Sequence, residues 1–100
     1  MLVFFSISPL GAGESVSKPV SEIIELIDRS GLDYQVTAMG TIFEGPREKV
    51  FALLEECHAH MKKSYSRVTS KILIDDRGEL SGTLKSKIDS LERHLGRKLG

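Results

Sequence analysis

The chain has 100 residues, and its 14 Lys and Arg side chains balance 14 Asp and Glu side chains to a formal net charge of +0. This length predicts a single domain over residues 1–100 with a core of modest size. The balanced charge excludes the basic excess of a general nucleic-acid binder and the polybasic arm of a membrane-surface protein.

The single cysteine, Cys57, cannot form an internal disulfide, and this fits a reducing cytoplasm. The apolar start of the chain has no charged region and gives way to Pro9-Leu10-Gly11. It is therefore too short for a signal peptide or a membrane span. We expect a cytoplasmic domain whose partners include neither nucleic acid nor a membrane.

The first predicted element is a strand from Leu2 to Ser8. One of its faces is apolar and suits a core beneath helices: Val3, Phe5 and Ile7. The other face mixes large apolar groups with hydroxyls: Leu2, Phe4, Ser6 and Ser8. A sheet face of this mixed kind is often covered by a partner subunit or a ligand.

A loop from Pro9 to Glu14 leads into a helix that Ser15 or Ser17 can cap. The apolar side chains of this segment recur at helical spacing: Val16, Val20, Ile23, Ile24 and Ile27. Pro19 then lies in the first turn, where its missing N–H does no harm, and Ser30-Gly31 ends the helix.

A hairpin follows, with strands from Leu32 to Ala38 and from Thr41 to Glu44 around a turn at Met39-Gly40. Gly45-Pro46 ends the second strand and opens a helix from Arg47 to Lys63. The buried stripe of this helix has five members: Val50, Leu53, Leu54, Cys57 and Met61.

The last strand runs from Arg67 to Asp75 with alternating polarity, and Asp76-Arg77-Gly78 is a turn. Thr83 can cap a final helix. Its apolar stripe has four members: Leu84, Ile88, Leu91 and Leu95.

This order of elements predicts an α+β fold, the ferredoxin-like sandwich, with a four-stranded antiparallel sheet. Right-handed crossovers place the first and third strands in the middle and two helices on one face. The final helix either covers part of the other face or docks on a neighbouring subunit.

The segment Cys57-His58-Ala59-His60 has the residue types of a metal cluster. On a helix, however, His58 and His60 point about 200° apart and cannot share one ion. Cys57 falls on the buried stripe, so we expect a core cysteine and no metal site.

Gly11-Ala12-Gly13 precedes a helix and could hold an anion, but its spacing matches no phosphate-binding motif, which favours an ordinary loop. Asp75-Asp76-Arg77-Gly78 lacks the spacing of a calcium loop. No Ser/His/Asp or Cys/His set is legible, so we expect no cofactor, no catalytic residue and no enzyme activity. An enzyme would have to use Glu44 or an aspartate as its base.

Eight residues lie on or near the face without helices, and all but the apolar Met39 carry polar groups that could orient a ligand: Ser6, Ser8, Thr37, Met39, Thr41, Glu44, Arg67 and Lys71. With Phe4 and Phe43 as apolar walls, this mix suits a small, flat, polar heterocycle. Thr41 and Glu44 have opposite parity, so they share a site only through a bulge or through another subunit. Glu44 also fits a plain solvated strand end.

Several motifs resemble the small thiamine-binding proteins of the YkoF-like superfamily: Ser6-Ile7-Ser8-Pro9-Leu10-Gly11, Ser30-Gly31-Leu32-Asp33-Tyr34, Met39-Gly40-Thr41-Ile42-Phe43-Glu44-Gly45, Arg67-Val68 and Ile74-Asp75-Asp76-Arg77. The resemblance implies a ferredoxin-like fold assembled into dimers and tetramers through the sheets. It also implies binding of thiamine, or of its hydroxymethylpyrimidine part, near a subunit interface and without known catalysis. The ligand-binding residues that it implies are Ser6, Ser8, Met39, Thr41, Glu44 and Arg67. Ala38 stands where many relatives have proline, which predicts a looser hairpin.

Our leading hypothesis is a non-enzymatic thiamine-class binding protein, acting as a carrier, buffer or sensor. The alternatives are an interaction module whose sheet face only builds an oligomer, and a small enzyme on a pyrimidine substrate. Leu2, Phe4 and Phe43 are too apolar for a solvated face, so we expect a homo-oligomer, a tetramer built as a dimer of dimers.

Overall fold

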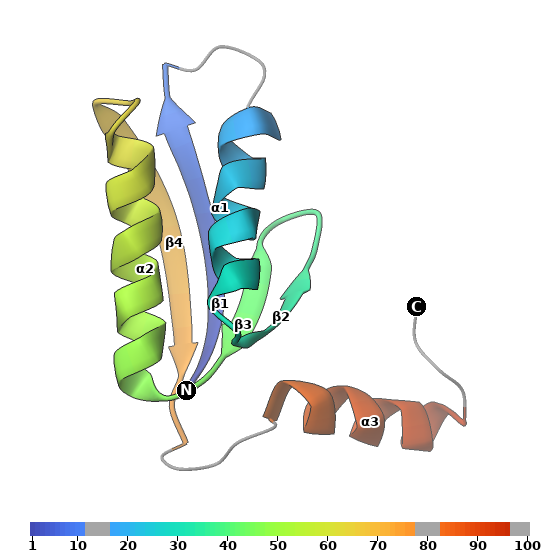
Figure 1. Cartoon of the computed structure of the whole chain (residues 1–100). Coiled ribbons are helices and arrows are strands. Elements are labelled where there is room, and N and C mark those ends of the chain that lie inside the picture. Colours follow the sequence, from blue (N-terminus) through green and yellow to red (C-terminus); the bar gives the residue numbers. More distant parts are fainter. Residues whose placement is uncertain (12–16, 78–82, 97–100) are drawn as a thin grey trace.

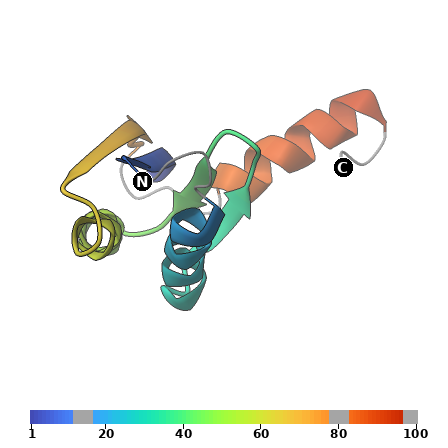
Figure 2. The same cartoon turned by 90° about the horizontal axis from the view of Figure 1, so that it is seen from above.

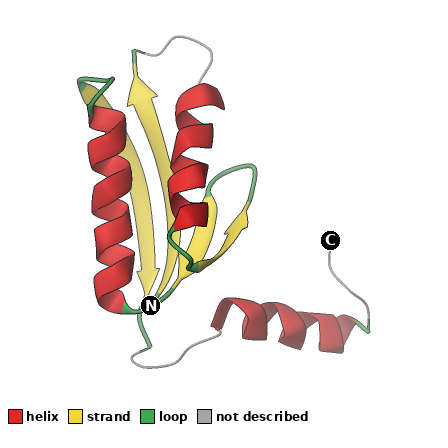
Figure 3. Cartoon of the chain, in the orientation of Figure 1, coloured by secondary structure: helices red, strands yellow, loops and turns green. Residues whose placement is uncertain are grey.

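The computed structural model describes residues 1–11, 17–77 and 83–96, and Figure 3 shows its helices and strands. They are β1 (Leu2–Leu10), α1 (Ser17–Arg29), β2 (Asp33–Val36), β3 (Thr41–Glu44), α2 (Arg47–Lys62), β4 (Arg67–Asp75) and α3 (Thr83–Leu95). The predicted cap Ser15, the apolar Val16, the Ala12-Gly13 part of the glycine loop and Gly78 lie outside the described residues, and so does the side chain of Leu84.

All the strand pairs are antiparallel, and the four strands lie in the order β2-β3-β1-β4. Helices α1 and α2 run side by side over one face of this sheet (Figures 1 and 2). The predicted ferredoxin-like sandwich is therefore confirmed, with the first and third strands in the middle.

Three strand ends differ from the prediction, and one of them is the start of β2, which lies at Asp33 and not at Leu32. Strand β1 continues through Pro9 to Leu10, because these residues pair with Val68 and Arg67 of β4. Strand β2 ends at Val36, two residues before the predicted end, because the chain turns at the next residue. The result is a nine-residue β1 beside a four-residue β3.

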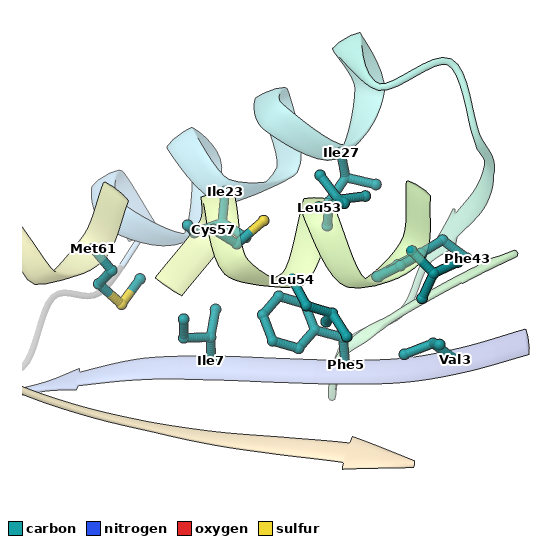
Figure 4. Packing of buried hydrophobic residues seen from close by; sticks show 11 residues of the cluster. Val3, Phe5, Ile7, Ile23, Ile27, Phe43, Leu53, Leu54, Cys57 and Met61 are labelled. Carbon is teal, nitrogen blue, oxygen red and sulfur yellow. The ribbon is translucent and has the colours of Figure 1, made fainter. Parts of the chain in front are cut away.

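The core lies between the sheet and the two helices (Figure 4). Strand β1 contributes its odd-numbered residues, and α2 contributes its whole predicted stripe. Of the predicted α1 stripe, Ile23 and Ile27 are in the core. The rings of Phe5 and Phe43 meet edge to face, with centroids 6.2 Å apart and an interplanar angle of 83°. This geometry is the one that aromatic pairs prefer.

Phe43 is a correction to the sequence analysis, which placed it as a wall of the open sheet face. Its side chain is 0% exposed in the core. The reason is register: Phe43 pairs with Val3, and directly opposed residues of antiparallel strands share a face.

Helix α3 lies on the other side of the sheet from α1 and α2, contacts β3 and extends beyond the sheet (Figures 1 and 2). Its residues Leu91 and Leu95 are 56% and 53% exposed, so these two members of its apolar stripe have little cover from the described part of the chain. None of the described helices is long and apolar enough to cross a membrane.

Cys57 gives a test of this core. It is fully buried, and burial, with a smaller contribution from the charge of Glu56, raises the pKa of its thiol to about 12. The reactive thiolate is therefore scarce at neutral pH. We expect slow modification by a thiol reagent, and Cys57→Ser should lower the free energy of unfolding by about 1–3 kcal/mol through a buried hydroxyl.

Urea denaturation measures this cost, with Ala59→Ser as the control on the exposed face of the same helix. That control should change the free energy of unfolding by less than about 0.5 kcal/mol. Rapid labelling of the native protein would show that Cys57 is accessible and contradict the prediction.

Candidate functional site

A hollow of about 730 Å³ lies between α1, the second half of β1 and the chain that joins β2 to β3. Its walls come from three segments: residues 5–8 of β1, the apolar side of α1, and residues 36–41. The α1 side chains are aliphatic: Val20, Ile23, Ile24 and Ile27. A hollow with apolar walls and a few polar groups is the usual form of a small-molecule site.

This hollow arises from the unequal lengths of β1 and β3. Strand β3 pairs with β1 only from Leu2↔Glu44 to Phe5↔Thr41. Beyond Phe5, β1 pairs with β4 on its other side but has no strand of the described chain on this side. Side chains of helix α1 form a wall of this gap, and a hollow remains where β3 would have continued.

The turn from Thr37 to Gly40 forms one rim of the hollow. The backbone N–H of Thr37 donates to the carbonyl of Gly40 at 2.9 Å, and the Thr37 hydroxyl donates to the same oxygen at 2.7 Å. The same hydroxyl accepts from the N–H groups of Met39 and Gly40, at 3.3 and 3.2 Å. Thr37 thus holds the turn together.

Gly40 is required by a close approach. A Cβ atom at this position would lie 2.6 Å from Cζ of Phe4 and 2.9 Å from the carbonyl oxygen of Phe5. The backbone of Gly40 does not adopt a positive φ, so the constraint is steric contact with β1 and not the left-handed conformation. The Phe4 ring therefore packs directly against the turn.

A second hollow, of about 490 Å³, lies on the open face of the sheet. Its walls include Phe4, Thr69 and Lys71, and it shares Ser6, Ser8 and Met39 with the first hollow. The side chains of Ser6 and Ser8 point to this open face, because they pair with Lys71 and Thr69 of β4. The two hollows thus lie on either side of one strand.

Of the eight residues singled out on the strands, Lys71 lines the second hollow and five line the first: Ser6, Ser8, Thr37, Met39 and Thr41. Glu44 lies at the opposite end of β3, 7% exposed, and Arg67 lies at the far end of β4 beside Leu10. Neither lines a described hollow of this chain. As their opposite parity predicted, Thr41 and Glu44 lie on opposite faces of the sheet. Thr41 faces the helices, Glu44 faces the open side, and no bulge interrupts the register of β3 with β1.

Sequence reasoning missed two groups of residues around these hollows. Val20, Ile24 and Val36 were assigned to structural roles, yet they line the first hollow. Val20 and Ile24 are only half-buried. The apolar side of α1 is therefore wider than the part of it that packs against the core. Thr69 and Ser70 of the second hollow could have been found from their place beside Ser8 and Ile7 in β4.

The first hollow has no charged side chain among its described lining residues. Met39, 84% exposed, stands at its rim, and Thr41, 4% exposed, places a hydroxyl among its apolar walls. An uncharged hollow of this kind favours a neutral, flat ligand over an ion, because an unbalanced charge would be costly there.

The histidines take no part in either hollow. Nε2 of His58 lies 3.2 Å from the hydroxyl of Ser70, and Nε2 of His60 lies 3.2 Å from a carboxylate oxygen of Glu22. Among the described residues there is no group of three side chains able to hold a metal ion.

Fold and site together define a class of protein: a small ferredoxin-like domain with an uncharged, ligand-sized hollow beside a central strand. A family model described as thiamine-binding protein matches residues 3–92. The chain belongs to this family.

Its relatives span nearly the whole chain. It is 35% identical over 86 residues to the UPF0045 protein MJ1052 of Methanocaldococcus jannaschii, which covers 86% of each chain. It is also 35% identical over 96 residues to the UPF0045 protein YqgV of Bacillus subtilis, covering 90% of this chain and 92% of the relative. A crystal structure of the M. jannaschii protein aligns with a TM-score of 0.81 at 33% identity, over 90% of this chain and 93% of that one.

The close packing at Gly40 predicts the effect of adding a methyl group there. Gly40→Ala should lower the free energy of unfolding by about 1–3 kcal/mol, the usual cost of overpacking, because the new Cβ meets both a ring and a backbone oxygen. Ala38→Ser, on the exposed part of the same turn, is the control and should change stability by less than about 0.5 kcal/mol. Equal denaturation midpoints for parent and Gly40→Ala would contradict the packing described here.

Proposed function

We propose that this protein binds thiamine, or its hydroxymethylpyrimidine moiety, without transforming it, and acts as a carrier, buffer or sensor. One observation carries the proposal: the hollow of about 730 Å³ is uncharged, has aliphatic walls and presents a few polar groups at β1 and Thr41. Membership of the thiamine-binding family supports the same ligand class.

The chemistry of the ligand suits such a hollow. An aminopyrimidine ring has two apolar faces and a polar edge, so its faces can lie against Val20 and Ile24 while its edge meets hydroxyl and backbone groups. The thiazolium ring carries a permanent positive charge, which this lining does not balance. We therefore place the pyrimidine inside and the thiazolium at the mouth, where solvent or a second subunit meets it.

The lining also supports binding without catalysis. None of its described side chains is a histidine, cysteine, carboxylate, lysine or tyrosine, the groups that usually transfer protons in an active site. An enzyme acting on the same pyrimidine would need such a group from elsewhere.

Calorimetric titration of the parent with thiamine and with hydroxymethylpyrimidine tests the proposal directly. Thr41→Val keeps the shape of the side chain and removes its hydroxyl, so it should weaken both ligands by about 1 kcal/mol, or roughly fivefold in Kd. No measurable binding of either ligand by the parent would refute the proposal, and product analysis after incubation would reveal any chemical conversion.

Glu44→Gln is the second arm of the same titrations, because it changes a carboxylate that lies outside the hollow of its own chain. We expect Kd values close to those of the parent for both ligands. A loss of about 1.5–3 kcal/mol for thiamine alone would instead place Glu44 of another copy against the thiazolium.

The open sheet face favours assembly as well as binding. Leu73 is 68% exposed and pairs with the half-buried Phe4, which leaves an apolar strip across β1 and β4. We propose that this face forms a subunit interface in a cytoplasmic homotetramer, built as a dimer of dimers, with the ligand site near the contact. The alternative function, an interaction module without a ligand, would use the same strip as its contact surface.

Light scattering at micromolar concentration should therefore give a mass above that of the 11.1 kDa monomer. Leu73→Asp and Phe4→Asp should dissociate the assembly, since each places an unpaired charge in the contact. Phe51→Asp is the control, because this exposed aromatic residue lies on α2 in the other layer. A monomeric parent would overturn the assembly.

A further inference from the structure

Along β1, the main-chain N–H and C=O groups point alternately to the two neighbouring strands, β3 and β4. The hydrogen bonds of Met1, just before the strand, show which residues point to which neighbour. The amino group of Met1 donates to the carbonyl of Gly45 at 2.9 Å, and the N–H of Gly45 donates back to the carbonyl of Met1 at 3.1 Å. In an antiparallel ladder, both main-chain groups of every second residue point to the same neighbour. The N–H and C=O groups of residues 3, 5 and 7, and the C=O group of Pro9, therefore point towards the side of β1 on which β3 lies.

An independent contact supports this phase. The carbonyl oxygen of Phe5 lies 2.9 Å from the position that a Cβ of Gly40 would take, so this oxygen does face the hairpin. The backbone groups of the even-numbered residues, Ser6 and Ser8 among them, point instead towards β4.

Strand β3 begins at Thr41, opposite Phe5, and so it does not reach Ile7. The next N–H and C=O groups of β1 that point to this side belong to Ile7. Its N–H and C=O meet no strand of the described chain and border the hollow. Two residues on, Pro9 offers a carbonyl but has no N–H. The free edge therefore presents one donor, one adjacent acceptor and one further acceptor.

We propose that the main-chain N–H and C=O of Ile7 are the recognition edge of the hollow, and that they take a planar heterocycle with an adjacent acceptor and donor. A 4-aminopyrimidine has this pattern: its ring nitrogen accepts from the N–H, and its amino group donates to the C=O. The ring then occupies the place where β3 would have continued. The ligand class rests on the proposed function.

Two features favour a small ring over an extended peptide at this edge. Pro9 removes the next donor that an added strand would need. The turn from Thr37 to Gly40 and helix α1 also bound the hollow on both sides, which leaves room for a compact ligand. Recognition through the backbone leaves the Ile7 side chain free to fill the core, where it is 6% exposed.

Amide hydrogen exchange followed by NMR tests this arrangement in the full chain. In the ligand-free protein, the amide of Ile7 should exchange faster than those of Val3 and Phe5, which pair with β3. Saturation with hydroxymethylpyrimidine should slow exchange at Ile7 at least about tenfold. The amide of Ser8, which points to β4, is the control and should not respond.

The outcomes separate this inference from the proposed function. Calorimetric binding of the pyrimidine with unchanged exchange at Ile7 would overturn the backbone recognition and leave the proposed function intact. Slow exchange at Ile7 without ligand would show that another segment or a second copy already pairs with this edge, which also overturns it. Absence of binding for both hydroxymethylpyrimidine and thiamine would overturn the proposed function and this inference together.

A backbone substitution gives a second readout. Replacement of Ile7 by the matching α-hydroxy acid exchanges its N–H for an oxygen and keeps the side chain, and ligation at Cys57 makes such a chain accessible by synthesis. Binding of hydroxymethylpyrimidine should weaken about fivefold, the effect of one lost hydrogen bond. The unfolding midpoint should fall only slightly, because the ester makes the carbonyl of Ser6 a weaker acceptor in the ladder with β4. The same replacement at Phe4 is the matched control, because the N–H of Phe4 points into the ladder with β4 and both main-chain groups of Ile7 stay unchanged. It should lower stability and leave the affinity for the pyrimidine as it is. Unchanged affinity in the Ile7 ester would contradict the proposal.

Discussion

The pairing of β1 with β3 is the constraint on which the rest of this structure depends. Two hydrogen bonds join Met1 and Gly45 just before this pairing, which then covers four residues of each strand, from Leu2↔Glu44 to Phe5↔Thr41. A longer β3 would satisfy the edge of β1 and fill the space beneath α1. The short pairing instead leaves main-chain polar groups beside aliphatic walls, and an unsatisfied edge in an apolar hollow favours a ligand that can complete it.

The turn after β2 connects the two faces of the sheet. Thr37 closes this turn with its hydroxyl, and Gly40 presses against the ring of Phe4. Phe4 belongs to the open face, where its cross-strand partner is Leu73. The same aromatic side chain therefore supports the rim of the hollow and forms part of the apolar strip, so burial of the strip would also fix the rim.

Most of the fold could be predicted from local patterns. The alternation of β1 and the stripes of α1 and α2 each identify a buried face, and Thr41–Glu44 and Arg67–Asp75 match the predicted strands to the residue. The burial of Phe43 was not predicted, because its face depends on register with Val3 and not on its neighbours in sequence.

The candidate site was predicted only in part, because local patterns identify some of its residues and the pairing of strands decides the others. Ser6, Ser8, Met39 and Thr41 come together because hairpin and strand patterns place them near one strand end. Glu44 and Arg67 stand in recognisable motifs, yet motif membership carries no information about which end of a strand faces a hollow. No single residue marks the gap, because it results from the difference in length between two strands. The predicted strands Leu2–Ser8 and Thr41–Glu44 already contained that difference.

Pro9 has a consequence for the behaviour of the protein at high concentration. An exposed strand edge is a template on which other chains can pair and aggregate, and natural sheets interrupt such edges with proline. Here the proline lies two residues beyond the single open donor, on the strand that would otherwise continue as a free edge to Leu10. The sheet can thus stay open to a small molecule while intermolecular strand growth along this edge is blocked.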